Sequence, residues 1–520
     1  MKSIYTFAFS IICLFITTTV CSQELTDREI GFNEAQVIVS LQEHGITDPE
    51  EVNREVEHIR ETNKEQYIVM KKREEEILQR IQPRQLLKAG AIADIPQSEK
   101  DALKALYDST NGANWKNKTG WDFSTPVISW NAATNTGWYG ITITNGHITS
   151  LSLIYNNLNG FMPTQIGQLN SLVLLKLEGN TLSGNIPSDI CKLTNLAFLS
   201  LEYNDFSGPL PSQIGNLSLL ESLKLSGNKL TEIPLSFYNL IKLSVCSLTD
   251  NSFSGEISPE ISKLINLEHL FFSWNKFSAI PLQIGQLNKL IDLELSFNEI
   301  GVMPKEIGQL QNLKYLNLDN NKLKGQIPSE IGLVSKLESL FLNYNQLEGS
   351  IPDEIRNLKN LKSLRLRSNQ LEDLLPDLTN LNLTSLDITN NNFRFVDFEN
   401  QFLSLKLSLL SNFYYDVQRW TDTPKTISAA TGRAVTLIMC EDNRFTANDT
   451  FQWYKDNSPI SGAVSRTYTL TNAKTTDTGT YTCRSYHNIN PDMSSLWLLR
   501  HPITLNVFNC TPITGTLKVL

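Results

Sequence analysis

The chain of 520 residues has little charge, few histidines and no block of basic residues. Charged residues make up 19% of it, below the usual quarter, and the hydrophobic share of 41% is close to the globular norm, so we expect most of the chain to fold. The formal net charge is −9, and the lack of a Lys/Arg cluster argues against a nucleic-acid partner. At about 150 residues per domain, the length predicts roughly three to four folding units.

Sequence motifs for catalysis and for metal binding are missing. The chain contains no G-x-S-x-G elbow, no H-E-x-x-H pair and no Gly-rich phosphate loop. Its six histidines are far apart, and none has a metal-ligand spacing to another histidine or to a cysteine. We therefore expect no catalytic residue, no metal site and no cofactor, which means a protein that is not an enzyme.

Long hydrophobic runs are missing after the first residues of the chain. Lys2 precedes an apolar run over residues 7–16, and Cys21 and Ser22 follow it, which predicts a secretory signal peptide over residues 1–22. A lipoprotein anchored through Cys21 and an uncleaved membrane anchor are alternatives, but the run is shorter than the ~18 residues of a membrane span. We expect a secreted or cell-surface protein with no transmembrane segment after the signal.

Residues 23–92 are predicted to form an N-terminal helical segment. Charged residues are frequent in its second half, and apolar residues such as Val56 and Ile77 recur at three- and four-residue steps and their multiples, which indicates an amphipathic helix. The heptad pattern breaks at Asn63 and at Glu74, so a charged helix next to the main domain is favoured over a coiled coil. The role of this segment stays open.

The middle of the chain repeats with a period of 22 to 24 residues. One period reads LVLLKLEGNTLSGNIPSDICKLTN, and residues 141–400 follow this frame about 11 times. The frame resembles the plant-type leucine-rich repeat family, which implies an α/β-type solenoid with parallel β-strands on its concave face. The asparagines of the frame are Asn156, Asn180, Asn204, Asn228, Asn251, Asn275, Asn298, Asn321, Asn345, Asn369 and Asn391.

Each period offers one apolar edge that it cannot bury alone. Alternate side chains of a strand face opposite sides, so Leu175 and Leu177 should point inward and Lys176 outward. Stacked coils would join these edges into one core, in which each buried Leu contributes about 1.5–3 kcal/mol before entropy is subtracted. We expect the asparagines to bond backbone groups that the turns leave unpaired, which is a structural role.

Residues 97–143 precede the first repeat and hold four tryptophans. Aromatic side chains here can cover the exposed edge of the first coil, and the segment resembles the N-terminal cap of plant-type repeats. The "WYGITI" motif lacks the cysteine pair of the plant caps, which resembles bacterial versions of the repeat. The tryptophans are Trp115, Trp121, Trp130 and Trp138.

Residues 413–508 carry a second combination of motifs. "AVTLIMC" ends at Cys440, "FQWYKD" contains Trp453, and "DTGTYTC" contains Tyr481 and Cys483. Together they resemble an immunoglobulin-like domain, which implies an all-β sandwich, a disulfide bond between the two cysteines across the tryptophan, and a tyrosine corner.

The resemblance to leucine-rich repeats implies that the variable side chains of each strand face the concave side. Exposed aromatic rings interleaved with acids are typical of protein-binding hot spots and of sugar-stacking platforms. The alternative is that the residue before each frame asparagine packs along the neighbouring coil, as Tyr155 and Tyr203 could. The predicted ligand-binding residues are Glu268, His269, Phe271, Trp274, Asp292, Glu294, Phe297, Tyr315, Asp319, Phe341 and Tyr344.

Two classes of function remain. The favoured one is a secreted or cell-surface recognition and adhesion protein that binds a protein or carbohydrate ligand through the concave face. The rival is a structural spacer or assembly module without a dedicated ligand, and a receptor-like ectodomain fragment is a third possibility. Residues 509–520 are too short for a domain and are read as a tail or a truncated module.

Overall fold

The computed structural model describes residues 26–27, 32–43, 47, 49–85, 95–415, 418, 422–440, 444–487 and 497–509. The chain divides into two compact units, residues 1–277 (unit 1) and residues 278–520 (unit 2). The predicted signal peptide and nearly all of the predicted tail lie outside the described residues. Among the helices that can be described, none combines the length and the apolar character that a bilayer crossing requires.

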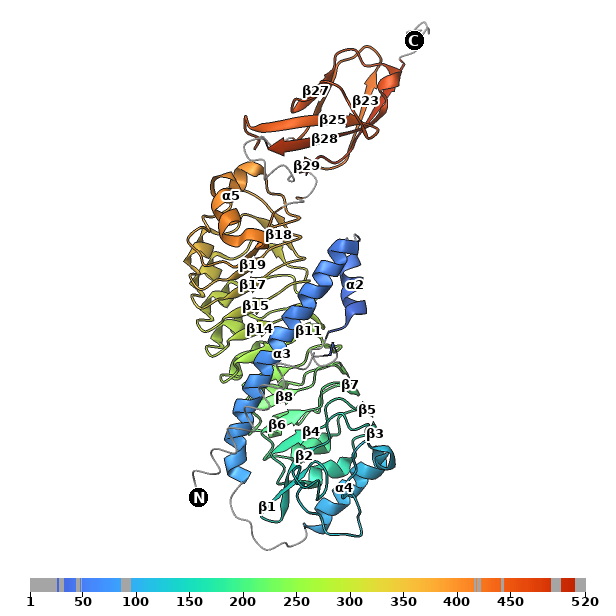
Figure 1. The fold of residues 1–520 in the computed structure, drawn as a ribbon, viewed down its shortest axis with the longest axis vertical. Helices are drawn as coiled ribbons and strands as arrows, with labels where there is room; N and C mark the ends of the chain where they lie inside the picture. Colours follow the sequence, from blue (N-terminus) through green and yellow to red (C-terminus); the bar gives the residue numbers. More distant parts are fainter. Residues whose placement is uncertain are drawn as a thin grey trace, which may run out of the picture. The chain divides into compact units, whose positions relative to one another are not determined.

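Unit 1 is built on a sheet to which each coil of the chain adds one short strand (Figure 1). The first two strands are antiparallel and the later ones pair in parallel, because every coil brings the chain back to the same side. This confirms the predicted solenoid with parallel strands. In order along the sheet, the strands are β1 (Ile141–Thr144), β2 (His147–Ser152), β4 (Leu174–Lys176), β6 (Phe198–Ser200), β8 (Ser222–Lys224), β10 (Val245–Ser247) and β12 (His269–Phe271).

Shorter strands and 3-10 helices complete the coils of unit 1. The short strands are β3 (Asn159–Phe161), β5 (Thr181–Gly184), β7 (Asp205–Gly208) and β9 (Lys229–Leu230), which form one sheet, and β11 (Ser254–Glu256) and β13 (Lys276–Ala279), which form a pair. The 3-10 helices are η1 (Gly112–Asn114), η2 (Thr164–Gln168), η3 (Ser188–Lys192), η4 (Ile214–Asn216), η5 (Leu235–Asn239) and η6 (Pro259–Lys263). Leu175 and Leu177 are fully buried between the coils, as the alternation predicts.

The frame asparagines join successive coils. Asn204 is representative: its side-chain amide donates to the carbonyls of Leu177 and Leu201 at 3.0 and 3.1 Å, and its Oδ1 accepts from the Leu182 amide at 3.0 Å. These partners lie on the coil of Asn204 and on the one before it. The asparagines therefore saturate backbone groups that the bend after each strand would leave unpaired, and their predicted structural role is confirmed.

The tryptophan-rich segment closes the first coil together with α4 (Gln97–Ser109). Trp115, Trp121 and Trp138 are buried, with ring centroids 4.7 Å apart for the first pair and 5.3 Å apart for Trp121 and Trp138. The indole N–H of Trp115 donates to the Thr110 carbonyl at 3.1 Å. These tryptophans are core residues of the cap.

Two helices occupy the predicted helical segment, α2 (Glu34–Glu43) and α3 (Pro49–Gln85). Val37, Leu41 and Val56 are buried, and Arg60 of α3 contacts Glu34 at 2.7 Å. The two helices therefore pack against each other and form a hairpin.

Unit 2 continues the same coil pattern. Its parallel strands are β14 (Asp292–Glu294), β15 (Tyr315–Asn317), β17 (Ser339–Phe341), β19 (Ser363–Arg365), β21 (Ser385–Asp387) and β22 (Phe413–Tyr414), and a second sheet holds β16 (Lys324–Gly325), β18 (Gln346–Gly349) and β20 (Gln370–Leu371). The turns contain η7 (Leu282–Gln286), η8 (Lys305–Gln309), η9 (Ser329–Leu333), η10 (Asp353–Asn357), α5 (Phe395–Leu409) and η11 (Leu410–Asn412). Because β22 pairs with β21, the repeat sheet extends beyond residue 400, the predicted end of the repeats.

The last part of unit 2 is all-β apart from one 3-10 helix. One sheet has the order β23 (Lys425–Ala430), β30 (Ile503–Phe508), β28 (Gly479–His487), β25 (Asp449–Lys455) and β26 (Ser458–Pro459), with β29 (Trp497–Leu499) paired to β28. A second pair consists of β24 (Val435–Ile438) and β27 (Thr467–Leu470), and η12 spans Thr475–Asp477. Trp453 and Tyr481 are buried, and the Tyr481 hydroxyl donates to the Asp477 carbonyl at 2.7 Å.

The predicted disulfide bond between Cys440 and Cys483 is absent from this structure, and both side chains are buried. The Cys440 sulfur lies 3.3 Å from Asp422 Oδ1 and 3.7 Å from a guanidinium nitrogen of Arg394. The Cys483 sulfur contacts the Arg484 carbonyl at 3.7 Å. Polar groups other than a second sulfur therefore surround each thiol, and burial raises the pKa of Cys483 despite the opposing effect of Arg500.

Candidate functional site

The candidate site is the strand face, defined as the side of the parallel sheet on which the variable strand residues lie. In unit 1, pairing in register aligns side chains of successive strands into columns. One column runs Lys176, Ser200, Lys224, Ser247 and Phe271, and its neighbour runs Leu174, Phe198, Ser222, Val245 and His269. The first column presents ammonium groups beside small hydroxyls, and the second presents mostly apolar groups.

Helix α3 lies on this part of the strand face (Figure 1). Ile77 is completely buried and forms one apolar cluster with Phe198 and Val245 from the strands and with Ala197. Leu78 packs against the same cluster. The apolar column of the face is therefore covered by a helix of the same chain.

A buried group of charges lies next to the apolar cluster. Glu74 of α3 forms an ion pair with Lys176, and its second oxygen is 3.5 Å from Nζ of Lys224. Lys224 also contacts Glu202 at 2.8 Å. Side-chain exposure is only 6% for Glu74 and 3% for Lys224, so water screens this group weakly.

The pKa shifts follow from this arrangement. Burial alone would raise the pKa of Glu74, but the ammonium groups of Lys224 and Lys176 outweigh it and hold that pKa well below its usual range. Burial alone would lower the pKa of Lys224, yet Glu202 and Glu74 raise it well above its ordinary value. Glu74 and Lys224 are therefore both charged at neutral pH, and each supplies a counter-charge to the other.

Two further ion pairs flank the buried group. Arg73 contacts Glu268 at 2.5 Å, and Arg80 contacts Glu221 at 3.1 Å. Together with Glu74 and Ile77 these arginines occupy steps of one, three and three residues along α3, which places them on one side of the helix. Glu268, one of the predicted ligand-binding residues, thus already has a partner within the chain.

In unit 2 the strand face carries aromatic rings and guanidinium groups. Phe341 meets the ring of Tyr315 edge to face at 5.3 Å, and the Arg365 guanidinium lies over Phe341, 4.6 Å from the ring centroid. Arg367 lies 6.0 Å from the ring centroid of Tyr344. The structure therefore brings together Tyr315 and Phe341, two of the predicted aromatic residues. It also places Arg365 over Phe341 and Arg367 near Tyr344, and neither arginine belongs to the predicted site.

Asp319 is a buried acid of this part of the face, and its pKa is raised. Its Oδ1 accepts from the Asn343 backbone amide at 2.5 Å and its Oδ2 lies 3.1 Å from the side-chain amide of the same residue. Burial raises the pKa of Asp319 to about 8, against the opposing effects of Arg365 and of the Asn343 amide. The carboxyl group is therefore mostly protonated at neutral pH.

The expectation that the aromatic residues of the site are exposed is wrong for four of them. Phe271 and Tyr344 retain only 2% of their accessible surface, and Tyr315 and Phe341 are also buried. The acids Asp292, Glu294 and Asp319 and the ring of His269 are buried too. The reason is lateral packing of neighbouring side chains on the face. The His269 and Phe271 rings of β12 are parallel at 6.2 Å, and the Tyr315 and Phe341 rings of neighbouring strands meet at 5.3 Å.

The residue before each frame asparagine has a special backbone conformation. Trp274, Phe297 and Tyr344 have φ values of 55°, 54° and 53°, in the left-handed region. Trp274 and Phe297 are only partly buried. At the equivalent Tyr155 the ring lies so close to Gly179 that a Cβ there would approach it to 2.2 Å, so packing along the neighbouring coil, the alternative considered above, does occur at this position.

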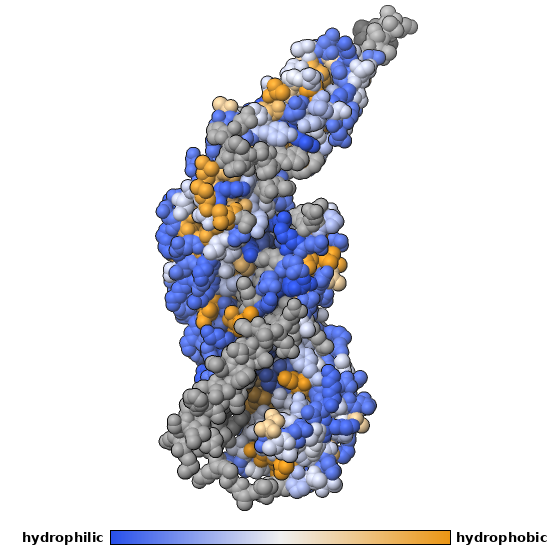
Figure 2. All heavy atoms as spheres, viewed as in Figure 1, coloured by the Kyte–Doolittle hydropathy of each residue, from blue (hydrophilic) through white to orange (hydrophobic). Residues whose placement is uncertain are grey.

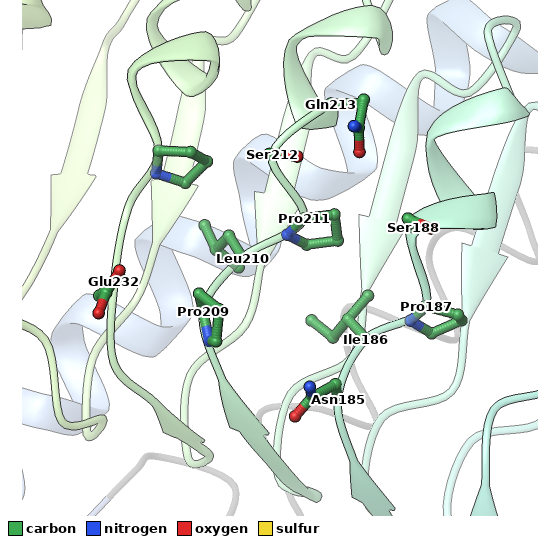
Figure 3. Close-up of a pocket in the computed structure, with 11 residues that line it drawn as sticks. Asn185, Ile186, Pro187, Ser188, Pro209, Leu210, Pro211, Ser212, Gln213 and Glu232 are labelled. Carbon is green, nitrogen blue, oxygen red and sulfur yellow. The ribbon is translucent and has the colours of Figure 1, made fainter.

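Other surfaces of the molecule are weaker candidates for a binding site than the strand face. Figure 3 shows a pocket of the repeats that apolar residues such as Ile186 and Leu210 line together with polar ones such as Asn185 and Glu232. Figure 2 shows hydrophobic residues gathered over α5 and η11, where Leu403, Leu407 and Leu410 are exposed. Among the described residues, no group of three or more His, Cys, Asp or Glu side chains could hold a metal ion.

The coils match models of known protein families. Residues 243–431 match a family model described as a leucine-rich repeat region, and residues 171–193, 195–217 and 219–240 match the leucine-rich repeat model. The matched segments are leucine-rich repeats. No curated protein matches the chain.

Parts of the chain are similar to solved structures, among them the following three. A plant peptide hormone receptor, RGFR1 in complex with RGF2, is 29% identical over 54% of this chain and 48% of its own, with a TM-score of 0.44. A plant ice-binding protein is 25% identical over 58% of this chain and 88% of its own, with a TM-score of 0.44. The Leptospira interrogans leucine-rich repeat protein LIC12759 is 30% identical over 49% of this chain and 75% of its own, with a TM-score of 0.38. The chain spans about half the length of the plant receptor chain.

Proposed function

We propose that this chain is a secreted or cell-surface recognition protein, without enzymatic activity, whose leucine-rich repeats bind a protein partner through the strand face. The observation that carries the proposal is that the face holds a protein helix, α3, through buried ion pairs and a buried isoleucine. The side chains of the face are thus complementary to a polypeptide surface.

A protein ligand is favoured over a carbohydrate. Sugar stacking needs open ring faces, and Phe271, Phe341 and Tyr344 are buried. Lys176 and Lys224 instead contact a carboxylate, the group that acidic peptide segments supply. The predicted signal peptide supports export.

The C-terminal strands support an adhesion role in addition to recognition. We propose that β23 to β30 form an immunoglobulin-like module, supported by the buried Trp453 and by the hydrogen bond from Tyr481 to Asp477. Such modules commonly extend extracellular proteins and present further binding surfaces.

An array of extracellular proteins and glycans tests the proposal. The chain to be probed carries Glu74→Lys and Ile77→Asp, here called the release variant, because these changes oppose the contacts of α3 and expose the face. Adding Lys224→Glu should weaken partner binding at least tenfold, whereas Lys229→Glu, an identical change at an exposed lysine, should leave it unchanged.

Two results would contradict the proposal. Binding that Lys224→Glu and Lys229→Glu affect equally would place the partner elsewhere on the chain. If no variant binds a protein, the rival function, a spacer without a dedicated ligand, is favoured. The burial of most predicted site rings is consistent with that rival function.

A further inference from the structure

We infer that α3 is an intramolecular ligand of the strand face, and that the partner replaces it with an amphipathic helix that carries a carboxylate three residues ahead of an aliphatic side chain. The existence of an external partner rests on the proposed function. The occupation of the face by α3 rests on the contacts alone.

The composition of α3 indicates a helix that depends on its binding surface. Most of its residues are polar or charged, and its apolar side chains in the second half divide into two groups. Ile77 is buried against the repeats, whereas Ile68 and Val69 are exposed. The contact with the face is therefore narrow, so a competing helix needs to match only a few side chains.

The positions of the charges specify what a competitor must supply. Lys176 and Lys224 lie in one column, two strands apart, and Glu74 reaches both. If α3 leaves, Lys224 keeps Glu202 and Lys176 keeps Glu178, but the two ammonium groups lose the carboxylate they share. A carboxylate at this point therefore re-forms the contacts that Glu74 makes with both ammonium groups, at a site that water screens weakly.

The apolar cluster determines the second feature of a competing helix, an aliphatic side chain, and its spacing from the carboxylate. Ile77 follows Glu74 by three residues, so both side chains point to the same side of a helix. Ala197, Phe198 and Val245 pack against the isoleucine, which favours an aliphatic side chain there. The face thus selects a helix by an acidic residue and an aliphatic residue at a fixed separation.

Covalent linkage makes α3 an effective competitor. A tethered ligand acts at an effective concentration that reaches about millimolar for short linkers, so an external helix of the same intrinsic affinity is largely excluded. The wild-type chain is therefore expected to be closed, and a change that weakens α3 is expected to open it.

A synthetic peptide of residues 49–85 provides the test, measured by fluorescence anisotropy against the full-length chain. The release variant should bind this peptide at least tenfold more tightly than the wild-type chain does. A peptide that carries Glu74→Lys and Ile77→Asp should not bind. A control peptide with Glu75→Lys and Ile68→Asp has the same types of change at exposed positions and should bind like the natural peptide.

The outcomes separate the two proposals. Equal peptide binding by the wild-type chain and the release variant, or no binding by either, overturns the inference. Circular dichroism verifies that the release variant is folded. If the release variant does not fold, the single variant Ile77→Asp takes its place. Peptide binding without any protein hit on the array supports occupation by α3 and contradicts the proposed function. A partner that binds wild type and release variant equally well supports the function and contradicts the inference.

Discussion

Glu74 and Lys224 are 150 residues apart in sequence, yet their charged groups approach to 3.5 Å, and both are almost completely buried. One belongs to the helix that precedes the repeats and the other to a strand within them. This pair, together with Ile77, attaches α3 to the strand face.

Neutralising one member of the pair should loosen the helix. Glu74→Gln removes the carboxylate that Lys176 and Lys224 share, and removing one partner of a buried ion pair costs up to about 3–5 kcal/mol. We expect proteolysis within α3 to become at least tenfold faster under native conditions. Glu75→Gln, at the exposed neighbouring position, should leave the rate unchanged; equal acceleration by both variants would show that the buried pair does not hold the helix.

Attachment of α3 should resist mild acid. Because the folded pKa of Glu74 is held below its unfolded value of 4.5, its contribution is fully present above that value and is lost as the pH falls toward the folded pKa. Protease protection of α3 should therefore persist from pH 7 to about 5 and decline only below that range. In Glu74→Gln the protection should be weak at every pH, and a wild-type loss of protection between pH 7 and 5 would contradict the assignment.

Asp319→Asn should stabilise the protein at neutral and alkaline pH. A folded pKa of about 8, above the ordinary 3.8, means that the folded state binds a proton that the unfolded state releases, so stability falls as the pH rises through this window. The amide removes this dependence and keeps one of the two acceptors that Asn343 uses, the oxygen that accepts from its backbone amide. Thermal unfolding should show a gain of about 1–3 kcal/mol at pH 8 and none at pH 4. Asp353→Asn, at an exposed acid, serves as the control, and a destabilised Asp319→Asn would refute the raised pKa.

Replacing one of the frame asparagines should lower the free energy of unfolding. Asn204→Ala leaves the Leu182 amide without its partner, and it removes one of the two asparagine donors of the Leu177 and Leu201 carbonyls. Because a buried polar group left unpaired costs about 1–3 kcal/mol, urea unfolding should show a loss of at least ~1 kcal/mol. Asn170→Ala, at an exposed turn, should change stability by less than about 0.5 kcal/mol. Similar losses in both variants would mean that the frame asparagines are not what joins the coils.

The repeats could be predicted from the sequence because their pattern is local. The pattern within each period predicts which leucines point inward and which asparagine follows the strand. Leu175 and Asn204 lie as the pattern predicts. The helical nature of α3 follows in the same way from the spacing of its apolar residues.

The docking of α3 could not be predicted, because it depends on contacts between distant residues. Glu74 breaks the hydrophobic pattern of the helix, and by sequence alone it marks a solvated position, whereas in the fold it is buried between Lys176 and Lys224. Burial of the site rings was missed for a related reason. Arg365 is not among the predicted site residues, but strand pairing places it over Phe341.

Hydrogen exchange of the α3 backbone tests the central claim most directly. If α3 occupies the strand face, amides of residues 71–80 exchange slowly in the full-length chain, lose at least tenfold protection in Glu74→Lys/Ile77→Asp, and keep it in Glu75→Lys/Ile68→Asp. Rapid exchange in the wild-type chain, or equal protection in all three proteins, would show that the helix does not occupy the face.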